Sequence, residues 1–493
     1  MNKMVINHID KLFVTSDAFT VIREVEVNHP AARMIALAAK MQEDEAGDGT
    51  NFVISLAGEL MLKAEILLKM GLHPSIILQG YEKASIKALQ IIEEMSVEEI
   101  KNFNEKEELL KILKSVVGAK VYGQEHIVGS LIADAVLHSM PKNPSKFSID
   151  NIRTQTVLGG SIEDSVVIHG MVILRSSLTS VNSVQKAKIA VYNTPIEMQQ
   201  GDTKGTVLLK NAQELLDYTK GEEEQMERFV QSIAEAGVNV VICQSNISEL
   251  AVHFMEKYKI LTLKIMSKFE LKRIAKSVGA SLMVKLGAPT QEELGFAHSV
   301  EFQEISSQKC TVIRRDEEEN KISTIVLRGS TKSMLEDLER TIDDGVNSIK
   351  CVIKDGRLLA GAGAAEIHLS SKIQELARAE TDLDQYAIEA FGQAFEIIPR
   401  TLAENAGHKA EAVIANLYAA KSMRAGINID TGAVEDVTIH GIYDSLEVKS
   451  WAIKLTVDAV LTILKVDQII MSKPSGGPNT NRAAPKPDGY DDE

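Results

Sequence analysis

Hydrophobic residues near both ends of the chain recur every three or four positions, with polar residues between them. This spacing is typical of amphipathic helices, so the first hundred residues and the stretch from Ser333 to about Met471 are predicted to be mainly helical. A short extended piece at Lys11–Thr15 precedes the first helical run, and the turn-like Gly118-Ala119-Lys120 interrupts the helical pattern of residues 101–137. The predicted helices near the N-terminus are Ala31–Gln42, Phe52–Met70 and Pro74–Met95.

After Pro141 the pattern changes to short apolar runs separated by glycines and polar turns. Between Lys188 and Leu286 strands and helices are predicted to alternate, which indicates a parallel sheet with crossover helices. Thr311–Arg315 and Thr324–Arg328 are predicted to form a hairpin around a charged segment at 316–321. The other expected strands are Thr154–Leu158, Val166–Leu174, Ile189–Tyr192, Thr206–Leu209, Val238–Cys243, Ile260–Ile265 and Ser281–Val284, and the expected helices are Ala212–Ala236, Ile247–Tyr258 and Glu270–Val278.

Two helical ends that enclose a β-rich middle suggest one split domain with other domains inserted at its centre. The chain has 493 residues, a length that predicts about three domains. A glycine-rich break at Gly361-Ala362-Gly363 interrupts the second helical part. Residues 474–493 are rich in Pro, Gly, Asn and Asp and are predicted to be disordered. We therefore expect a multidomain α+β fold.

The composition and the charge argue against several classes of function. The net charge is −15 without a basic stripe, which argues against nucleic-acid binding. Three widely spaced cysteines form no C-x-x-C pair, which argues for a reducing compartment and against a structural zinc site. The most apolar long run, Trp451–Met471, is broken by charged residues and is predicted to be a packed helix, not a membrane span. The N-terminus is too charged for a signal peptide. We expect a soluble cytoplasmic protein.

One short stretch carries candidate chemistry, Gly47-Asp48-Gly49-Thr50-Asn51, between two predicted helices. Its glycines allow a tight turn and a close approach of backbone N–H groups to a ligand. Thr50 and Asn51 suit the start of the second helix, where free N–H groups attract an anion. Asp48 can reach a hard cation such as Mg²⁺. The stretch therefore predicts a site for a metal-bound phosphate, with an ordinary Asp-Gly turn as the alternative.

Several separate stretches resemble one family, the group II chaperonins, in the order in which that family has them. The resemblance extends from residue 1 to about residue 473. The stretches are Met1-Asn2-Lys3-Met4, Thr15-Ser16-Asp17-Ala18, His29-Pro30-Ala31-Ala32, Gly47-Asp48-Gly49-Thr50, Leu327-Arg328-Gly329, Gly361-Ala362-Gly363 and Ile398-Pro399-Arg400-Thr401-Leu402-Ala403-Glu404-Asn405.

The resemblance implies three domains. A mostly helical, split equatorial domain would comprise residues 1–100, without the family's first segment, and 359–473. An intermediate domain would comprise residues 101–166, beginning with equatorial-derived helices, and residues 321–358. An α/β apical domain with a helical protrusion, residues 167–320, would bind substrate, and 474–493 would be a disordered tail.

The resemblance also implies a function. The family uses ATP and Mg²⁺ to close a built-in lid over unfolded clients such as actin and tubulin, inside a double ring of different subunits. An alternative is a ring member with a structural role and little hydrolysis of its own. A third alternative, a metal-dependent phosphotransferase, has little support because no G-x-x-x-x-G-K-[ST] loop is present.

The family's site residues correspond to particular positions here. Asp48 resembles the Mg²⁺ ligand, and Asp17 resembles the acidic residue near the γ-phosphate and the attacking water, although a helix cap is the simpler explanation for Asp17. Lys120 resembles the lysine that senses the γ-phosphate. A dinucleotide fingerprint at Gly361–Glu366 is a weak alternative because Glu366 replaces the third glycine and no clear strand precedes it. The remaining nucleotide-contacting positions are Gly49, Thr50, Asn51, Phe52, Gly118, Ala119, Gly363, Asp444 and Lys449.

Three departures from the family pattern lead to further expectations. Gln393 falls where the family's catalytic aspartate is expected, and an amide cannot accept a proton from water, so slow or absent hydrolysis is predicted. Gly118-Ala119 replaces a more polar pair. The Gly-Pro turn and the helix that normally precede Met1 are not in this sequence, so either the sequence is incomplete or the pocket lacks one wall and part of a strand shared with a neighbouring subunit.

Client binding is expected on the apical helices Ile247–Tyr258 and Phe269–Val278 and on the charged stretch around Gln213–Arg228. Three apolar residues at helical spacing, Leu250, Phe254 and Tyr258, are predicted to pack against the sheet. The cationic residues beside them are better candidates for recognising acidic client segments, although a solvated helix face is an equally good explanation. These residues are Lys257, Lys272, Arg273 and Lys276.

Overall fold

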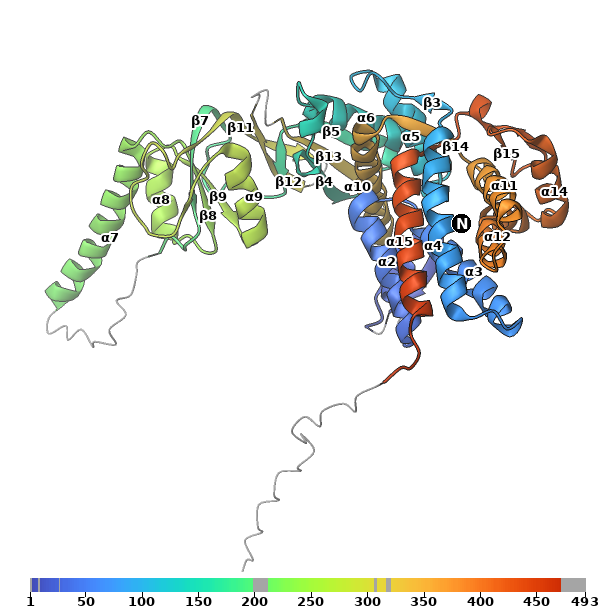
Figure 1. Cartoon of the computed structure of the whole chain (residues 1–493). Helices are drawn as coiled ribbons and strands as arrows, with labels where there is room; N and C mark the ends of the chain where they lie inside the picture. The colour runs from blue at the N-terminus through green and yellow to red at the C-terminus, as the bar shows by residue number, and fades with distance from the viewer. Residues whose placement is uncertain are drawn as a thin grey trace, which may run out of the picture.

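The two ends of the chain meet in one helical bundle at one end of an elongated molecule, at the right of Figure 1. The computed structural model describes residues 2–7, 9–25, 27–197, 212–305, 308–315 and 321–470. The core of the bundle contains Leu56, Leu60 and Tyr81 from the first hundred residues. It also contains Phe391 and Ile453 from the C-terminal part of the chain. Its principal helices are α2 (Pro30–Ala46), α3 (Thr50–Lys69), α4 (Pro74–Glu94), α11 (Ala364–Ala379), α12 (Gln385–Ala394) and α15 (Leu446–Leu464).

Local sequence explains where these helices begin and end. Proline occupies the first position of α2 and of α4, where its missing N–H costs no hydrogen bond. The side chains of His29 and His73 cap these two helices by accepting a hydrogen bond from a backbone N–H of the first turn. Gly47 ends α2 in the left-handed conformation, with φ of 70°.

A second core lies in the middle of the molecule. Helices α5 (Lys106–Gly118), α6 (Glu125–Ser139) and α10 (Lys332–Lys354) pack against a sheet of three strands in the order β4-β13-β5. Its strands are β4 (Ile152–Leu158), β5 (Val166–His169) and β13 (Ser323–Gly329). Leu113, Ile132 and Ile342 are fully or almost fully buried between them.

The far end, at the left of Figure 1, is a mixed sheet covered by helices on both faces. Strands β7 (Ser183–Tyr192), β8 (Val240–Gln244) and β9 (Leu261–Ile265) are parallel, as predicted. Helices α7 (Ala212–Glu235) and α8 (Glu249–Lys257) cover one face, and α9 (Lys268–Val278) covers the other. The remaining strands are β10 (Leu282–Met283), parallel to β7, and the antiparallel β11 (Gly295–Ile305), β12 (Gln308–Arg314) and β6 (Met171–Ile173).

The predicted hairpin of Thr311–Arg315 with Thr324–Arg328 is wrong. β12 pairs with β11 and β6, whereas β13 pairs with β4 and β5 in the other sheet. The physical reason is burial: residues 323–327 of β13 are fully buried, and a strand of a two-stranded hairpin would leave one edge without partners. The alternating strand β11, which the sequence pattern did not reveal, is the partner that β12 uses. The sheet is therefore mixed and not purely parallel.

Most other predicted helices and strands occur within a few residues of their expected bounds. The expected strand Thr206–Leu209 and the tail 474–493 lie outside the described residues. The smaller elements are α1 (Ala18–Glu24), α13 (Ile397–Asn405), α14 (Ala410–Ala420) and the strands β1 (Lys3–Ile6), β2 (Leu12–Thr15), β3 (Glu98–Glu99), β14 (Arg357–Ala360), β15 (Ala425–Ile427), β16 (Val434–Asp436) and β17 (Tyr443–Ser445).

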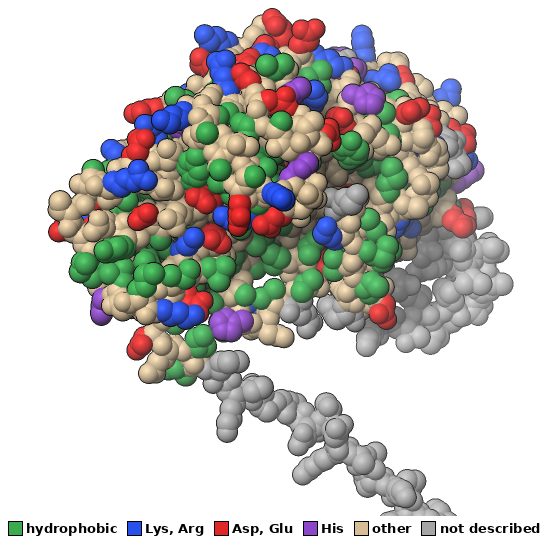
Figure 2. All heavy atoms as spheres, turned by 90° about the vertical axis from the view of Figure 1, so that its right-hand side faces the viewer, with side chains coloured by type: hydrophobic (Ala, Val, Ile, Leu, Met, Phe, Trp, Pro, Cys, Tyr) green, Lys and Arg blue, Asp and Glu red, His purple; other side chains and the backbone are tan. Residues whose placement is uncertain are grey.

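Within the described ranges, no helix is both long and apolar enough to cross a membrane. Figure 2 shows the face formed by the helical bundle, where charges of both signs are scattered and hydrophobic side chains gather toward the lower part. Three exposed apolar residues of the bundle, Leu62, Ile66 and Met70, are spaced four residues apart on α3 and its end.

Candidate functional site

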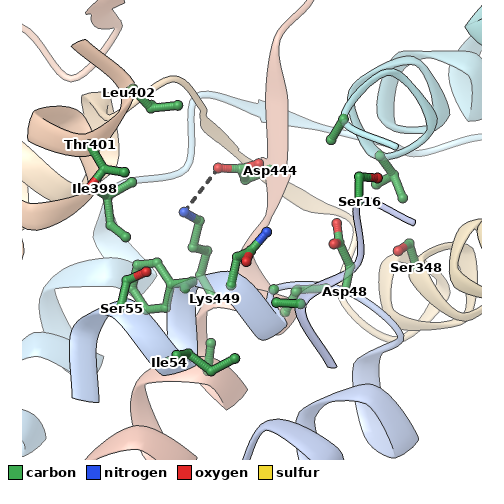
Figure 3. A pocket seen from close by; sticks show the side chains of 18 of the residues that line it. Ser16, Asp48, Ile54, Ser55, Ser348, Ile398, Thr401, Leu402, Asp444 and Lys449 are labelled. Atoms are coloured by element: carbon green, nitrogen blue, oxygen red, sulfur yellow. Dashed lines mark ion pairs between the residues drawn. The ribbon is translucent and has the colours of Figure 1, made fainter. Parts of the chain in front are cut away.

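A cavity of about 640 Å³ opens where the two ends of the chain meet, and Figure 3 shows it from close by. Asp48, Gly49 and Asn51 line it from the loop between α2 and α3. Asp444 and Lys449 line it from β17 and α15. The two sets lie almost four hundred residues apart in sequence, and the fold brings them together. Other lining residues are Ser16, Phe52, Ser55, Ala119, Ser348, Ile398, Thr401, Leu402, Ser445 and Val448.

The loop at Gly47-Asp48-Gly49 is built around two glycines with positive φ, 70° and 83°. A Cβ atom on Gly47 would clash with the side chain of Asn347, so only glycine fits there. Gly49 is the N-cap of α3 and supplies no side-chain cap, which leaves N–H groups of the first turn available to a ligand. Such a helix start attracts phosphate oxygens through its N–H groups and its positive dipole end.

Gln42 of α2 holds this loop in place. Its Nε2 atom donates to the carbonyl oxygens of Asp48, at 2.8 Å, and of Val448 on α15, at 3.2 Å. Gln42 is fully buried. The hydrogen bonds tie the Asp48 loop to the helix that carries Lys449, and thereby fix the two sides of the cavity to each other.

Three acidic side chains surround Lys120 next to Asp48. The Lys120 ammonium forms an ion pair with Asp344 of α10, and both side chains are buried. Asp17 caps α1 by accepting from the N–H of Thr20 at 2.7 Å, and also accepts from the Thr50 hydroxyl at 3.2 Å. The helix-cap explanation of Asp17 is thus confirmed, and the same carboxylate lies beside the start of α3. Glu43 of α2 completes the group through its interactions with Asp344, Asp17 and Lys120.

Burial and like charges perturb these groups. Burial raises the pKa of Asp344, and the nearby Asp48 and Asp17 raise it further, while Lys120 opposes the shift. Burial also raises the pKa of Glu43, with Asp344 as the next cause. Burial acts to raise the pKa of Asp17 too, but the Thr20 hydrogen bonds and the Lys120 charge outweigh it and hold that pKa below its usual value. Three neighbouring carboxyls therefore differ in proton affinity, which is typical of functional sites.

These shifts predict a dependence of stability on pH. Glu43 and Asp344 hold protons to higher pH in the folded chain than in the unfolded chain, so the folded state binds more protons above about pH 4. The free energy of unfolding of the ligand-free chain should therefore fall as pH rises from 5 to 8, by roughly 1–3 kcal/mol. Glu43→Gln should flatten this dependence in urea-unfolding curves, whereas Asp44→Asn at the exposed neighbour should leave it unchanged. An unchanged slope in Glu43→Gln would contradict the assignment.

A second charged group lies at the opposite side of the cavity. The Lys449 ammonium pairs with the buried Glu366 of α11 and with Asp444 Oδ2 at 3.2 Å, the pair marked in Figure 3. It also lies 4.7 Å from the centroid of the Phe52 ring. Burial opposes the charged form of Lys449, but the carboxylates of Asp444 and Glu366 outweigh it and raise its pKa. Lys449 is therefore a buried, paired cation in the wall of the cavity.

The Gly361-Ala362-Gly363 loop lies beside Asp444. It follows β14, whose Leu359 pairs with Asp444 of β17. Gly363 has φ of 82°, and a Cβ there would lie 2.8 Å from Pro399 Cβ, next to the cavity-lining Ile398. A strand does precede this loop, contrary to the sequence-based expectation. Because β14 pairs antiparallel with both of its neighbours, the loop still does not belong to a parallel dinucleotide-binding unit.

The prediction for Gln393 does not agree with the structure. Gln393 is not among the lining residues, and its Oε1 accepts from Lys63 Nζ of α3 at 3.4 Å. Lys63 lies thirteen residues beyond Thr50 on α3, about 20 Å along a helix. An amide at that position cannot orient a water near the Asp48 loop. The position of Gln393 therefore gives no reason to expect slow ATP hydrolysis.

Sequence reasoning missed Asp344, the buried acid that does lie in the cluster. One signal was present: Asp344 shares the buried face of α10 with Leu338, Thr341 and Ser348. A charged residue on the core face of an amphipathic helix is unusual unless it is paired. Of the other predicted residues, Gly118 ends α5 without lining the cavity, and Thr50 is buried between the lining residues Gly49 and Asn51.

A metal ion would need help from a ligand at this site. Among the described residues, no group of three or more acidic, histidine or cysteine side chains is arranged to hold a metal. Mg²⁺ typically binds through one or two carboxylates together with phosphate oxygens and water, so Asp48 alone suits a metal that arrives with a phosphate. The hydroxyls of Ser348 and Ser445, which line the cavity, have no hydrogen-bond partner in the described part of the chain. Such unpartnered buried groups fit a polar ligand.

On α8 and at its C-terminal end, Leu250, Phe254 and Tyr258 pack against the sheet core, as predicted. Lys257 is exposed and pairs with Glu227 of α7. The other three cationic candidates, Lys272, Arg273 and Lys276, line a separate small cleft on α9.

Comparison with known proteins identifies a family and several relatives. The sequence model of the TCP-1/cpn60 chaperonin family matches residues 1–474. T-complex protein 1 subunit theta of Dictyostelium discoideum is 48% identical over 488 residues, which are 98% of this chain and 91% of that protein. The proteins of the same name from Arabidopsis thaliana and Homo sapiens are each 45% identical, over 98% and 97% of this chain and 89% and 88% of their own lengths. The likeness thus extends over all three regions of the fold.

Proposed function

The chain belongs to the TCP-1/cpn60 chaperonin family, and from that premise we propose that it acts as a theta-type subunit of a hetero-oligomeric double-ring chaperonin in the cytoplasm. In this proposal it binds and hydrolyses ATP, and the resulting domain movement encloses unfolded clients of the actin and tubulin class. The observation that carries the proposal is the cavity formed by both ends of the chain, with the Asp48 loop beside the Asp344–Lys120 pair.

The domain division expected from sequence is part of the proposal. Residues 1–100 and 359–473 would form the equatorial domain, 101–166 and 321–358 the intermediate domain, and 167–320 the apical domain. The three separate cores support this division. The exposed apolar stripe at Leu62, Ile66 and Met70 suits contact with neighbouring subunits, because monomeric surfaces seldom leave such stripes uncovered.

Different residues would contact different parts of the nucleotide. Asp48 would hold Mg²⁺, which when bound neutralises phosphate charge. The start of α3, at Gly49, Thr50 and Asn51, would bind phosphate oxygens. Asp444 would bind a ribose hydroxyl, and Phe52 together with other apolar lining residues would contact the base. Gly363, which has no side chain, would let the backbone of its loop approach the nucleotide from the same side as Asp444.

Asp344 is the group that we assign to the attacking water, in place of Gln393. Its raised pKa makes the carboxylate a better proton acceptor than an ordinary aspartate. Lys120, held at Asp344, would stabilise negative charge on the terminal phosphate. Asp17, which keeps its negative charge, would help to orient the water.

Asp48→Asn tests the metal assignment. The amide keeps the size of the side chain but loses its charge, so the affinity for ATP in the presence of Mg²⁺ should fall about tenfold or more, a loss of at least 1.4 kcal/mol. Affinity for ATP measured without Mg²⁺, by titration with a fluorescent ATP analogue, should change little. Asp44→Asn, the same change at an exposed position of α2, should affect neither value. An Asp48→Asn chain with normal Mg²⁺ dependence would overturn the assignment.

A further inference from the structure

A cleft of about 200 Å³, which shares no lining residue with the nucleotide cavity, lies where α9 meets the beginning of β4. Four cationic side chains line it: Lys272, Arg273 and Lys276 from α9, and Arg153 from β4. One carboxylate, Asp150, is also in the lining. This concentration of positive charge contrasts with the net charge of −15 of the whole chain.

The cations of the cleft are poorly neutralised by the protein. In the described part of the chain, Arg153, Lys272 and Arg273 form no ion pair and no side-chain hydrogen bond. Lys276 Nζ lies 3.8 Å from Asp150 Oδ2, but both side chains are largely exposed, so this contact contributes little. Asp150 and Asp343 are the only carboxylates among the described residues whose charges act appreciably on Arg153.

The two arginines also repel each other. Arg153 is half-buried, and its pKa is lowered first by that burial and next by the charge of Arg273. Like charges held together in this way destabilise the folded chain, and an anion between them would remove the repulsion. Guanidinium groups bind phosphate oxygens in pairs, through parallel N–H donors.

We propose that this cleft is a second anion site, which binds a compact ligand carrying two or more phosphate groups. The cleft is smaller than the roughly 300–1,000 Å³ of typical small-molecule pockets, so it suits phosphate groups better than a whole nucleoside or a folded peptide segment. The position of the cleft would also affect movement between two regions of the fold. Arg153 belongs to the sheet of the middle core, whereas Arg273 belongs to the helix on the far sheet, so the ligand would link the two regions and restrict their relative movement.

Binding of inorganic tripolyphosphate to the full chain tests this site. Calorimetric titrations should be made with saturating Mg²⁺-ADP, so that the nucleotide cavity is filled. Arg273→Gln should weaken tripolyphosphate binding at least tenfold, and Arg153→Gln should do the same. Arg273 is exposed, so its replacement should not prevent folding. The matched control is Lys257→Gln on α8, on the opposite face of the sheet, which removes the same charge and should change affinity less than twofold.

Three results would overturn the site. The first is equal affinity for tripolyphosphate in Arg273→Gln and in the unmodified chain. The second is an equal loss of affinity in Lys257→Gln, which would indicate only a general charge effect. The third is equally effective competition by a polyglutamate peptide, which would indicate an acidic polypeptide as the ligand. None of these results depends on whether the chain hydrolyses ATP. Failure of this proposal is therefore distinguishable from failure of the proposed function.

Discussion

Replacing Asp344 with asparagine is expected to slow ATP hydrolysis by about 10²–10⁴-fold, while nucleotide affinity changes by less than about threefold. Asparagine has almost the same shape and can still accept a hydrogen bond from Lys120, so the geometry of the cluster should persist. It cannot take a proton from water. The measurement is single-turnover hydrolysis in rings whose other subunits are inactive, together with a separate titration of nucleotide binding.

The neighbouring aspartate supplies a matched control. Asp343 is exposed on the same helix, and its charge acts on Arg153 instead of Lys120. Asp343→Asn should therefore leave hydrolysis within about twofold of the unmodified chain, well below the effect of losing an acid–base group. Gln393→Asp should bring no gain in turnover, because Lys63 holds that side chain far along α3. Normal hydrolysis in Asp344→Asn, or a gain in Gln393→Asp, would contradict the proposed role.

The local parts of the site could be predicted from sequence. The turn formed by Gly47, Asp48 and Gly49 can be recognised from five consecutive residues, because a tight turn before a helix start depends little on contacts with the rest of the chain. The same holds for the helix that begins at Pro74, whose first position suits proline, and the helix expected from Ala31 begins one residue earlier, at Pro30. These features depend on neighbours in the chain, and they occur where they were expected.

The parts that depend on packing could not be predicted in the same way. Asp344 enters the cluster only because α10 packs against α2 and α5, which places it beside Lys120 and Glu43. Motif spacing directed attention to Gln393, whose real neighbour is Lys63. The burial of Lys449 could not be predicted because Glu366, its buried partner, lies 83 positions earlier in sequence.

The error in strand pairing has a similar origin. β12 and β13 are close in sequence and both rich in apolar residues, so local reasoning joined them. Their partners are set by the two cores that they complete: Val312 and Ile313 pair with β6, whereas Ile325 and Val326 pair with β4 and β5. A buried strand needs partners on both edges, and one of those partners can be distant in sequence.

Replacing Lys449 with methionine is expected to destabilise the helical bundle by about 3–5 kcal/mol. Glu366 is almost completely buried, and the substitution would leave its carboxylate without the cation that compensates for burial. The contact with the Phe52 ring would be lost as well. Trp451, the single tryptophan of the chain, lies on α15 two residues after Lys449, so its fluorescence reports urea unfolding of this helix directly.

Two further variants distinguish the buried charge from a general effect on α15. Lys454→Met makes the same change at an exposed position of the helix, where the lysine ammonium lies 5.4 Å from the centroid of the Trp451 ring, and should cost less than about 1 kcal/mol. Adding Glu366→Leu to Lys449→Met should recover most of the loss, because both buried charges are then gone. If the double variant were as unstable as Lys449→Met, the cost would come from packing, and the buried ion pair would not be its cause.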